Sequence, residues 1–147
     1  MDRTSAAILV VAAGTAIGAQ APINGTLSRS IGTFQATTVN FAVGLCLLLV
    51  IVAVAGGGFG GLADIGDAPW WSLLGGVCGV AIVSASIVGV RSLGAGGVTA
   101  AVVAGQLTAS VLIDRFGLFG VEKQSITTSK IAGIALLLAG VALIVRE

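Results

Sequence analysis

The sequence predicts an all-α membrane protein with five transmembrane helices in a single transmembrane domain that covers residues 1–147. Hydrophobic residues make up 56% of the chain and charged residues only 9%, which is too few to coat a soluble protein of this length. The charged residues divide the chain into five charge-free stretches, and a hydrocarbon core of about 30 Å needs roughly 20 apolar residues in a helix. We therefore predict spans at about residues 5–28, 33–56, 69–90, 94–114 and 128–146.

The first four stretches meet the length requirement directly. They are bounded in turn by Arg3, Arg29, Asp64, Asp67, Arg91 and Asp114. The fifth, between Lys130 and Arg146, is shorter. We expect residues 127–129 to continue its helix and the two cations to reach the lipid headgroups.

The start of the chain has a second interpretation. Arg3, the apolar run at residues 6–13 and the Ala19-Gln20-Ala21 triplet imitate a secretory signal peptide with a cleavage site. Because the charge-free stretch continues well past the triplet, we expect the first span to be retained.

A glycine-rich run separates spans two and three. Residues 56–61 read GGGFGG and match the GxGxxG pattern of dinucleotide-binding loops. Such a loop must follow a strand and begin a helix, whereas this run follows a membrane span. We expect a flexible interfacial loop, with Pro69 in the first turn of span three and Trp70 and Trp71 as interfacial anchors.

The basic residues are divided almost evenly between the two sides of the membrane. With five spans, one side of the membrane has four basic residues, Arg3, Arg115, Lys123 and Lys130. The other side has three, Arg29, Arg91 and Arg146. An excess of Lys and Arg normally fixes orientation. This near-tie leaves two topologies open, namely insertion in both orientations and a single, weakly preferred orientation.

The residue inventory excludes several kinds of chemistry. There is no His, and the two cysteines, Cys46 and Cys78, lie within spans two and three, where they suit a packing role. Neither a zinc site nor a His-dependent catalytic triad can be built from this inventory. We expect no enzyme activity, no cofactor, no metal and no nucleic-acid partner.

Polar residues inside membrane spans are costly and mark a pathway by default. Gln20 and Asn24 lie one turn apart in span one, and Pro22 between them removes a backbone hydrogen bond. Asn40 lies in the first half of span two, at a similar depth if the two spans form a hairpin. These amides are candidate substrate-binding residues. The alternative is that each simply bonds a neighbouring helix.

Span four carries a polar stripe. Gln106, Ser110 and Asp114 follow one another at four-residue spacing and so share a helix face. We expect Gln106 and Ser110 to bind substrate and Asp114 to be a candidate for proton coupling. A salt-bridged or solvated helix cap beside Arg115 is the alternative for Asp114. Ser84 in span three is expected to bond to its own helix.

Span five offers small residues and no chemistry. Gly133 and Gly140 are seven residues apart and share one face among Leu, Ile, Val and Ala residues. Because helices in lipid approach closely through small residues, we predict that this face packs against a partner chain.

Several short motifs occur in a specific order along the chain. They are QAPING at 20–25, FAVG at 41–44, WW at 70–71, GGVCG at 75–79, AGQL at 104–107 and IDRFGLFG at 113–120. In this order and spacing they resemble the YdcZ-type branch of the drug/metabolite transporter superfamily. The resemblance covers nearly the whole chain. It implies a half-size, five-helix transporter of the bacterial inner membrane, two inverted copies of which form a ten-helix inverted repeat.

The resemblance implies alternating access by a dual-topology antiparallel dimer, with a small polar substrate bound near the midplane. The partner is either a second copy or an inverted paralogue, and lipid surrounds both. Small multidrug exporters of the same superfamily use a carboxylate in the first helix, which this chain lacks. Either Asp114 couples protons, or the substrate is neutral, zwitterionic or anionic, or transport is uncoupled. A passive channel, or a structural or regulatory subunit assembled through glycine-rich faces, is the alternative function.

Overall fold

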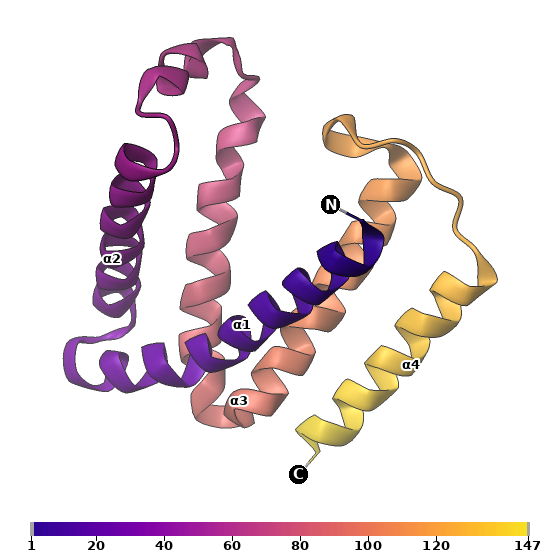
Figure 1. Cartoon of the computed structure of the whole chain (residues 1–147). Coiled ribbons are helices and arrows are strands. Elements are labelled where there is room, and N and C mark those ends of the chain that lie inside the picture. Colours follow the sequence, from indigo (N-terminus) through magenta and orange to yellow (C-terminus); the bar gives the residue numbers. More distant parts are fainter. Residues whose placement is uncertain (1, 147) are drawn as a thin grey trace. The chain divides into compact units, whose positions relative to one another are not determined.

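The protein is helical throughout the part of the chain that the computed structural model describes, residues 2–146 (Figure 1). Its α-helices are α1 (Arg3–Ile31), α2 (Thr33–Val54), α3 (Leu74–Phe116) and α4 (Thr128–Val145). Three short 3-10 helices, η1 (Gly60–Asp67), η2 (Trp70–Leu73) and η3 (Leu118–Gly120), lie in the connections. Residues 2–146 contain no strand, so the all-α prediction is confirmed and the glycine run before η1 is not a dinucleotide-binding loop.

Among the described residues, four helical segments are long and apolar enough to cross a membrane, and the third of them, Trp70–Phe116, has 47 residues. A straight helix as long as α3 would extend about 65 Å, twice the thickness of a hydrocarbon core. The helix is interrupted at Gly94, where φ is 66° and ψ is 177°. This conformation is available almost only to glycine.

The chain folds back at Gly94. A Cβ atom placed on Gly89 would lie 3.2 Å from Val98 Cγ2, although residues nine apart in a straight helix are separated by about 13 Å. The long helix α3 therefore comprises two segments, residues 74–93 and 95–116, at the positions of the third and fourth predicted spans.

The chain forms two compact units. We call residues 24–88 the central unit, and the residues up to 23 together with those from 89 onward the terminal unit. The central unit contains the last turns of α1, all of α2 and the first segment of α3, and the terminal unit contains the remaining helices.

In the central unit, α2 and the first segment of α3 form an antiparallel pair. Thr37 Oγ1 lies 3.2 Å from Ser84 Oγ, and further along α2 the ring of Phe41 lies against Gly79. Residue numbers therefore rise along α2 as they fall along α3. The small core of this unit consists of Ala36, Val83 and Ile87, with Leu27 of α1 packed against it.

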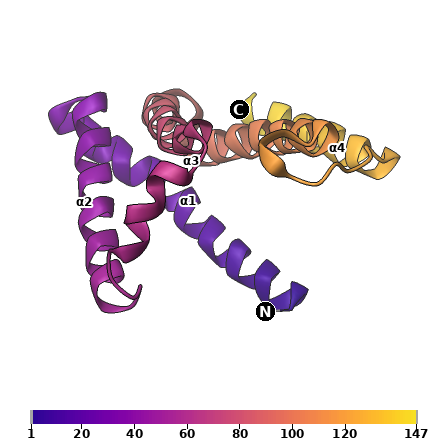
Figure 2. The ribbon, with the colours of Figure 1, turned by 90° about the horizontal axis from the view of Figure 1, so that it is seen from above.

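In the terminal unit, the second segment of α3 and α4 form another antiparallel pair. A Cβ atom on Gly97 would lie 3.7 Å from Val145 Cγ2, while Asp114 and Lys130 meet near the other end of the two helices. Figure 1 shows this pair side by side, and in Figure 2 the N-terminal end of α1 is directed away from it. The side chains of this part of α1 are strongly exposed, Val11 at 72%.

Helix ends follow local signals. Gly32, with φ 92°, is the single residue between α1 and α2, and α1 continues through Pro22 to Ile31. Thr127 caps α4 by accepting a hydrogen bond from the Lys130 N–H at 3.3 Å, so the predicted extension of the fifth helix is confirmed from Thr128.

At the N-terminal end of the chain, hydrogen bonds from the side chain and backbone of Ser5 hold the pKa of the Asp2 carboxyl below its usual value.

Very little of the surface is buried within one chain. The described buried residues are seven hydrophobic ones, three polar ones and two glycines, and α4 contributes none of them. Large apolar side chains such as Leu136, at 74% exposure, cover the helices. Surfaces of this kind contact lipid or another membrane protein.

Candidate substrate site

Buried and half-buried polar side chains occur on three helices of the central unit, and those of α2 and α3 meet. Asn24, Ser28 and Thr37 are the buried polar residues among those described, at 5%, 3% and 4% exposure. Ser84 of α3 contacts Thr37, and Asn40 lies three residues after Thr37, on the same side of α2. We call these five residues the central polar cluster.

The hydroxyl groups of this cluster are already hydrogen-bonded as donors. Ser28 Oγ donates to the Gly25 carbonyl at 2.9 Å, and Thr37 Oγ1 donates to the Thr33 carbonyl at 3.1 Å. Because Thr37 has one hydroxyl proton, the 3.2 Å contact with Ser84 is assigned with Ser84 Oγ as the donor.

Asn40 differs from its neighbours. Its Nδ2 atom is buried and has no hydrogen-bond partner, although the residue as a whole is half-buried. An unpaired buried donor costs about 1–3 kcal/mol, and no water is present in a bilayer core to relieve that cost. Asn40 therefore has a buried donor that the chain leaves without a hydrogen-bond partner.

The central polar cluster contains no charge. The charged residues of the central unit are Arg29, Asp64 and Asp67, and all three are exposed. Asp64 and Asp67 belong to η1 in the connection between helices, and Arg29 lies in the last turn of α1. The cluster is an uncharged hydrogen-bonding environment.

The other predicted site residues lie in the terminal unit. Gln20, Gln106 and Ser110 are exposed, and Asp114 is half-buried. Gln106, Ser110 and Asp114 follow the second segment of α3 at one-turn intervals. Gln20 and Asn24 are also one turn apart in α1, but they differ in burial and belong to different units. The structure thus brings Asn24 and Asn40 into one unit and the remaining four residues into the other.

Asp114 takes part in a small network with the α3–α4 connection. Its Oδ2 lies 3.6 Å from Lys130 Nζ, and Lys130 Nζ also donates to Gln124 Oε1 at 3.0 Å. The Gln124 N–H donates to the Asp114 carbonyl at 2.9 Å. Asp114 is therefore salt-bridged near the end of its helix, with Lys130 as the partner where the sequence pointed to Arg115.

The predicted packing face of α4 is open. A Cβ atom on Gly133 or Gly140 would meet nothing within 4 Å. Within residues 2–146 there is thus room for a larger side chain at both positions, and their role in dimer packing stays a prediction.

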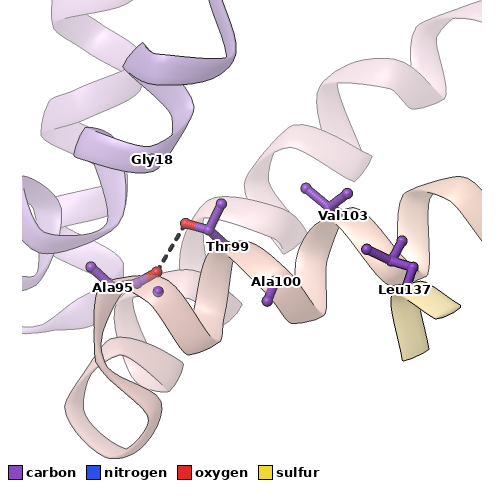
Figure 3. Close-up of a pocket in the computed structure, with 7 residues that line it drawn as sticks. Gly18, Ala95, Thr99, Ala100, Val103 and Leu137 are labelled. Atoms are coloured by element: carbon purple, nitrogen blue, oxygen red, sulfur yellow. Dashed lines mark hydrogen bonds between the residues drawn. The ribbon is translucent and has the colours of Figure 1, made fainter. Parts of the chain in front are cut away.

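A pocket of about 460 Å³ lies within the terminal unit. It is lined by Gly18, Ala95, Gly96, Thr99, Ala100, Val103 and Leu137 (Figure 3). The Thr99 hydroxyl donates to the Ala95 carbonyl at 2.9 Å, which leaves the lining mainly apolar. None of the predicted substrate-binding residues lines this pocket.

Sequence reasoning missed part of the central polar cluster. Ser28 is four residues after Asn24, and Thr37 is three before Asn40, so helical spacing alone associates them. Ser84 was expected to bond to its own helix, whereas its hydroxyl contacts Thr37 of the neighbouring helix. Among residues 2–146, no group of three or more His, Cys, Asp or Glu side chains is placed to hold a metal ion.

These features define a helical membrane protein that crosses the bilayer several times and carries uncharged polar side chains within its spans. Residues 5–143 match the sequence profile of a family described as "Putative inner membrane exporter, YdcZ". The inner membrane protein YdcZ of Escherichia coli (strain K12) is 30% identical over 150 residues, covering 100% of this chain and 99% of that protein. No solved structure matches the chain. The chain belongs to the YdcZ family and is a multi-pass inner membrane protein.

Proposed function

We propose that this protein is a small-molecule exporter that works by alternating access as a dual-topology antiparallel dimer. The observation that carries the proposal is hydrogen-bonding capacity at membrane depth that the chain leaves unused. Asn40 has an unpaired buried donor, and Gln20, Gln106 and Ser110 are exposed on apolar helices. Lipid cannot satisfy these groups, so a substrate pathway accounts for them.

The exposed apolar and amide side chains also favour assembly with a second copy of the chain. A single chain buries few residues, and its basic residues divide four to three between the two sides. Two oppositely inserted copies would cover apolar helix faces and turn the exposed amides toward a shared pathway, as in transporters built from inverted repeats. An inverted paralogue would serve the same purpose as an identical copy.

Asp114 is the candidate for proton coupling. Span one contains no carboxylate, while Asp114 lies at the end of the polar stripe and pairs with Lys130. Coupling through this residue would require the contact with Lys130 to break during transport. Asp114→Asn would then abolish coupled transport, whereas uncoupled transport of a neutral substrate would continue.

Export is tested with the full chain in proteoliposomes loaded with a mixture of small metabolites, by following their release with mass spectrometry. Asn24→Ala and Gln106→Ala should each reduce release at least tenfold at equal protein incorporation. Thr108→Ala is the matched control, because its hydroxyl donates to the Ala104 carbonyl of its own helix at 2.8 Å. Full release by both amide variants would contradict the proposed site.

The same assay separates the other classes of function. A passive channel would show release that does not saturate with concentration. A structural or regulatory subunit would release nothing, and replacing Gln106 by Leu would change its assembly instead.

A further inference from the structure

The connection between α2 and α3 contains an amphipathic 3-10 helix, η1 (Gly60–Asp67), whose residues are all exposed. Figure 1 shows it beyond the end of α2, in the connection that leads to α3. We propose that η1 lies on the membrane surface, with an apolar face inserted among the lipids and an acidic face in water. This inference goes beyond export and does not depend on it.

A three-residue repeat in the sequence gives η1 these two faces. A 3-10 helix has 3.0 residues per turn, so side chains three apart lie above one another. Phe59, immediately before η1, and Leu62 and Ile65 within it follow this spacing and are exposed. We call these three residues the apolar face. Asp64 and Asp67 follow the same spacing about 120° around the helix and form the acidic face, and the third side has only glycine and alanine.

Backbone hydrogen bonds hold the connection in this form. At the end of α2, the Gly58 N–H donates to the Val52 carbonyl at 3.1 Å. After η1, the Ala68 N–H donates to the Ile65 carbonyl at 3.2 Å. The apolar face therefore belongs to a folded helix that begins directly after a glycine turn.

The length of the chain on either side places η1 at the level of the lipid headgroups. α2 ends at Val54, and the next segment able to cross a membrane begins at Trp70. The distance from Asp67 to Trp70 is at most about 11 Å of extended chain. The headgroup layer on each side of the hydrocarbon core is about 5–8 Å thick. The end of η1 therefore lies in this layer or directly beside it, where Trp residues such as Trp70 are also enriched.

Composition and size favour lipid as the partner of the apolar face. Residues 55–73 contain two Asp and no Lys or Arg, so no positive charge is present to attract anionic headgroups or an acidic protein. The three apolar side chains are far fewer than the roughly 20–30 residues that each partner contributes to a stable protein–protein interface. An interfacial helix instead buries its apolar face about 5–10 Å into the boundary between headgroups and acyl chains.

The test uses the full chain in phosphatidylcholine liposomes, with a nitroxide label on single cysteines. In a background with Cys46 and Cys78 replaced by Ala, Leu62→Cys and Ile65→Cys place labels on the apolar face, and Asp64→Cys places one on the acidic face. We expect labels on the apolar face to collide with oxygen, which concentrates in lipid, about threefold or more as often as with a water-soluble nickel complex. The order should be reversed on the acidic face.

A charge on the apolar face gives a second readout. With the label at Ile65→Cys, Leu62→Asp should withdraw η1 from the lipid and raise collisions with the nickel complex about threefold. Ala63→Asp is the matched control, because it adds the same charge to the side of η1 that has only glycine and alanine. Its collision rates should equal those of the labelled chain without the added charge.

Three results would overturn the proposal. Equal access of the nickel complex to both faces would show a solvated loop. Low collision rates with both reagents at positions 62 and 65 would show that protein, such as a second copy, covers the apolar face. A lipid-facing pattern that appears only after anionic phosphatidylglycerol is added would show electrostatic attachment in place of apolar insertion. None of these measurements involves transport, so failure of the exporter and failure of this inference are separate outcomes.

Discussion

Gly94 interrupts α3 and lets the chain fold back, so that the helix comprises two segments. Its φ of 66° and ψ of 177° are unfavourable for any residue with a Cβ atom. We predict that Gly94→Ala destabilises the protein by about 1–3 kcal/mol, measured by chemical unfolding in detergent. Gly105→Ala is the matched control, because Gly105 is helical with open space around it, and it should gain about 0.5–1 kcal/mol. Equal stability of the two variants would show that the turn does not depend on glycine.

The pair of Asp114 and Lys130 positions the α3–α4 connection. Their side chains are 28% and 31% exposed, so solvent screening limits their coupling to about 0.2–1 kcal/mol. We predict that Asp114→Lys and Lys130→Asp each destabilise the protein, and that the double variant recovers that amount in a double-mutant cycle. Cleavage of the connection by added protease should rise in each single variant and fall again in the exchange. Additive effects would mean that the pair contributes nothing.

Which site residues sequence alone can identify depends on how costly they are in lipid. Asn24 and Asn40 were identified because an amide in a span is expensive. Ser28, Thr37 and Ser84 were not predicted to be part of the central polar cluster because a hydroxyl can bond to its own helix, as Thr38 does with the Phe34 carbonyl at 2.9 Å. Whether a hydroxyl instead meets another helix depends on packing, which spacing along one helix does not define.

At the scale of the helix, charges along the chain predict the elements closely. The predicted spans 33–56 and 128–146 compare with α2 at Thr33–Val54 and α4 at Thr128–Val145. The helices lie close to these ranges, although α2 begins after Gly32 and ends before the glycine-rich run at 56–61, and α4 contains Lys130 in its first turn. The predicted spans 69–90 and 94–114 place the turn between them at residues 91–93, whereas the backbone makes it at Gly94.

The open face of α4 gives a prediction at this scale. Because a Cβ atom on Gly133 or Gly140 meets nothing within the chain, Gly133→Leu and Gly140→Leu should leave the monomer folded. They should weaken dimerisation at least tenfold if this face packs against a partner, measured by energy transfer between labelled chains in liposomes. Ala135→Leu adds similar bulk about 200° around the helix and should dimerise like the wild type. Unchanged dimerisation in both glycine variants would place the interface elsewhere.

At the scale of the whole molecule, the distribution of basic residues bears on how the chain is oriented in the membrane. The four-to-three division of basic residues follows from five spans, and the structure provides five helical segments at those positions. One chain leaves most of its apolar helix surface exposed. The sequence therefore predicts the number of helical segments. It does not predict which partner covers their apolar faces, because that depends on contacts between chains.

Orientation of the chain expressed alone is the decisive measurement at this scale. In a background with Cys46 and Cys78 replaced by Ala, Thr4→Cys and Ser30→Cys place single probes before and after the first span. With so small a charge bias, we expect about half of each variant to react with an impermeant maleimide in spheroplasts, and all of it after permeabilisation. A fixed orientation would label one variant fully and the other not at all. That result would rule out an antiparallel homodimer and require an inverted paralogue for the same architecture, whereas equal labelling at both positions would make the homodimer sufficient.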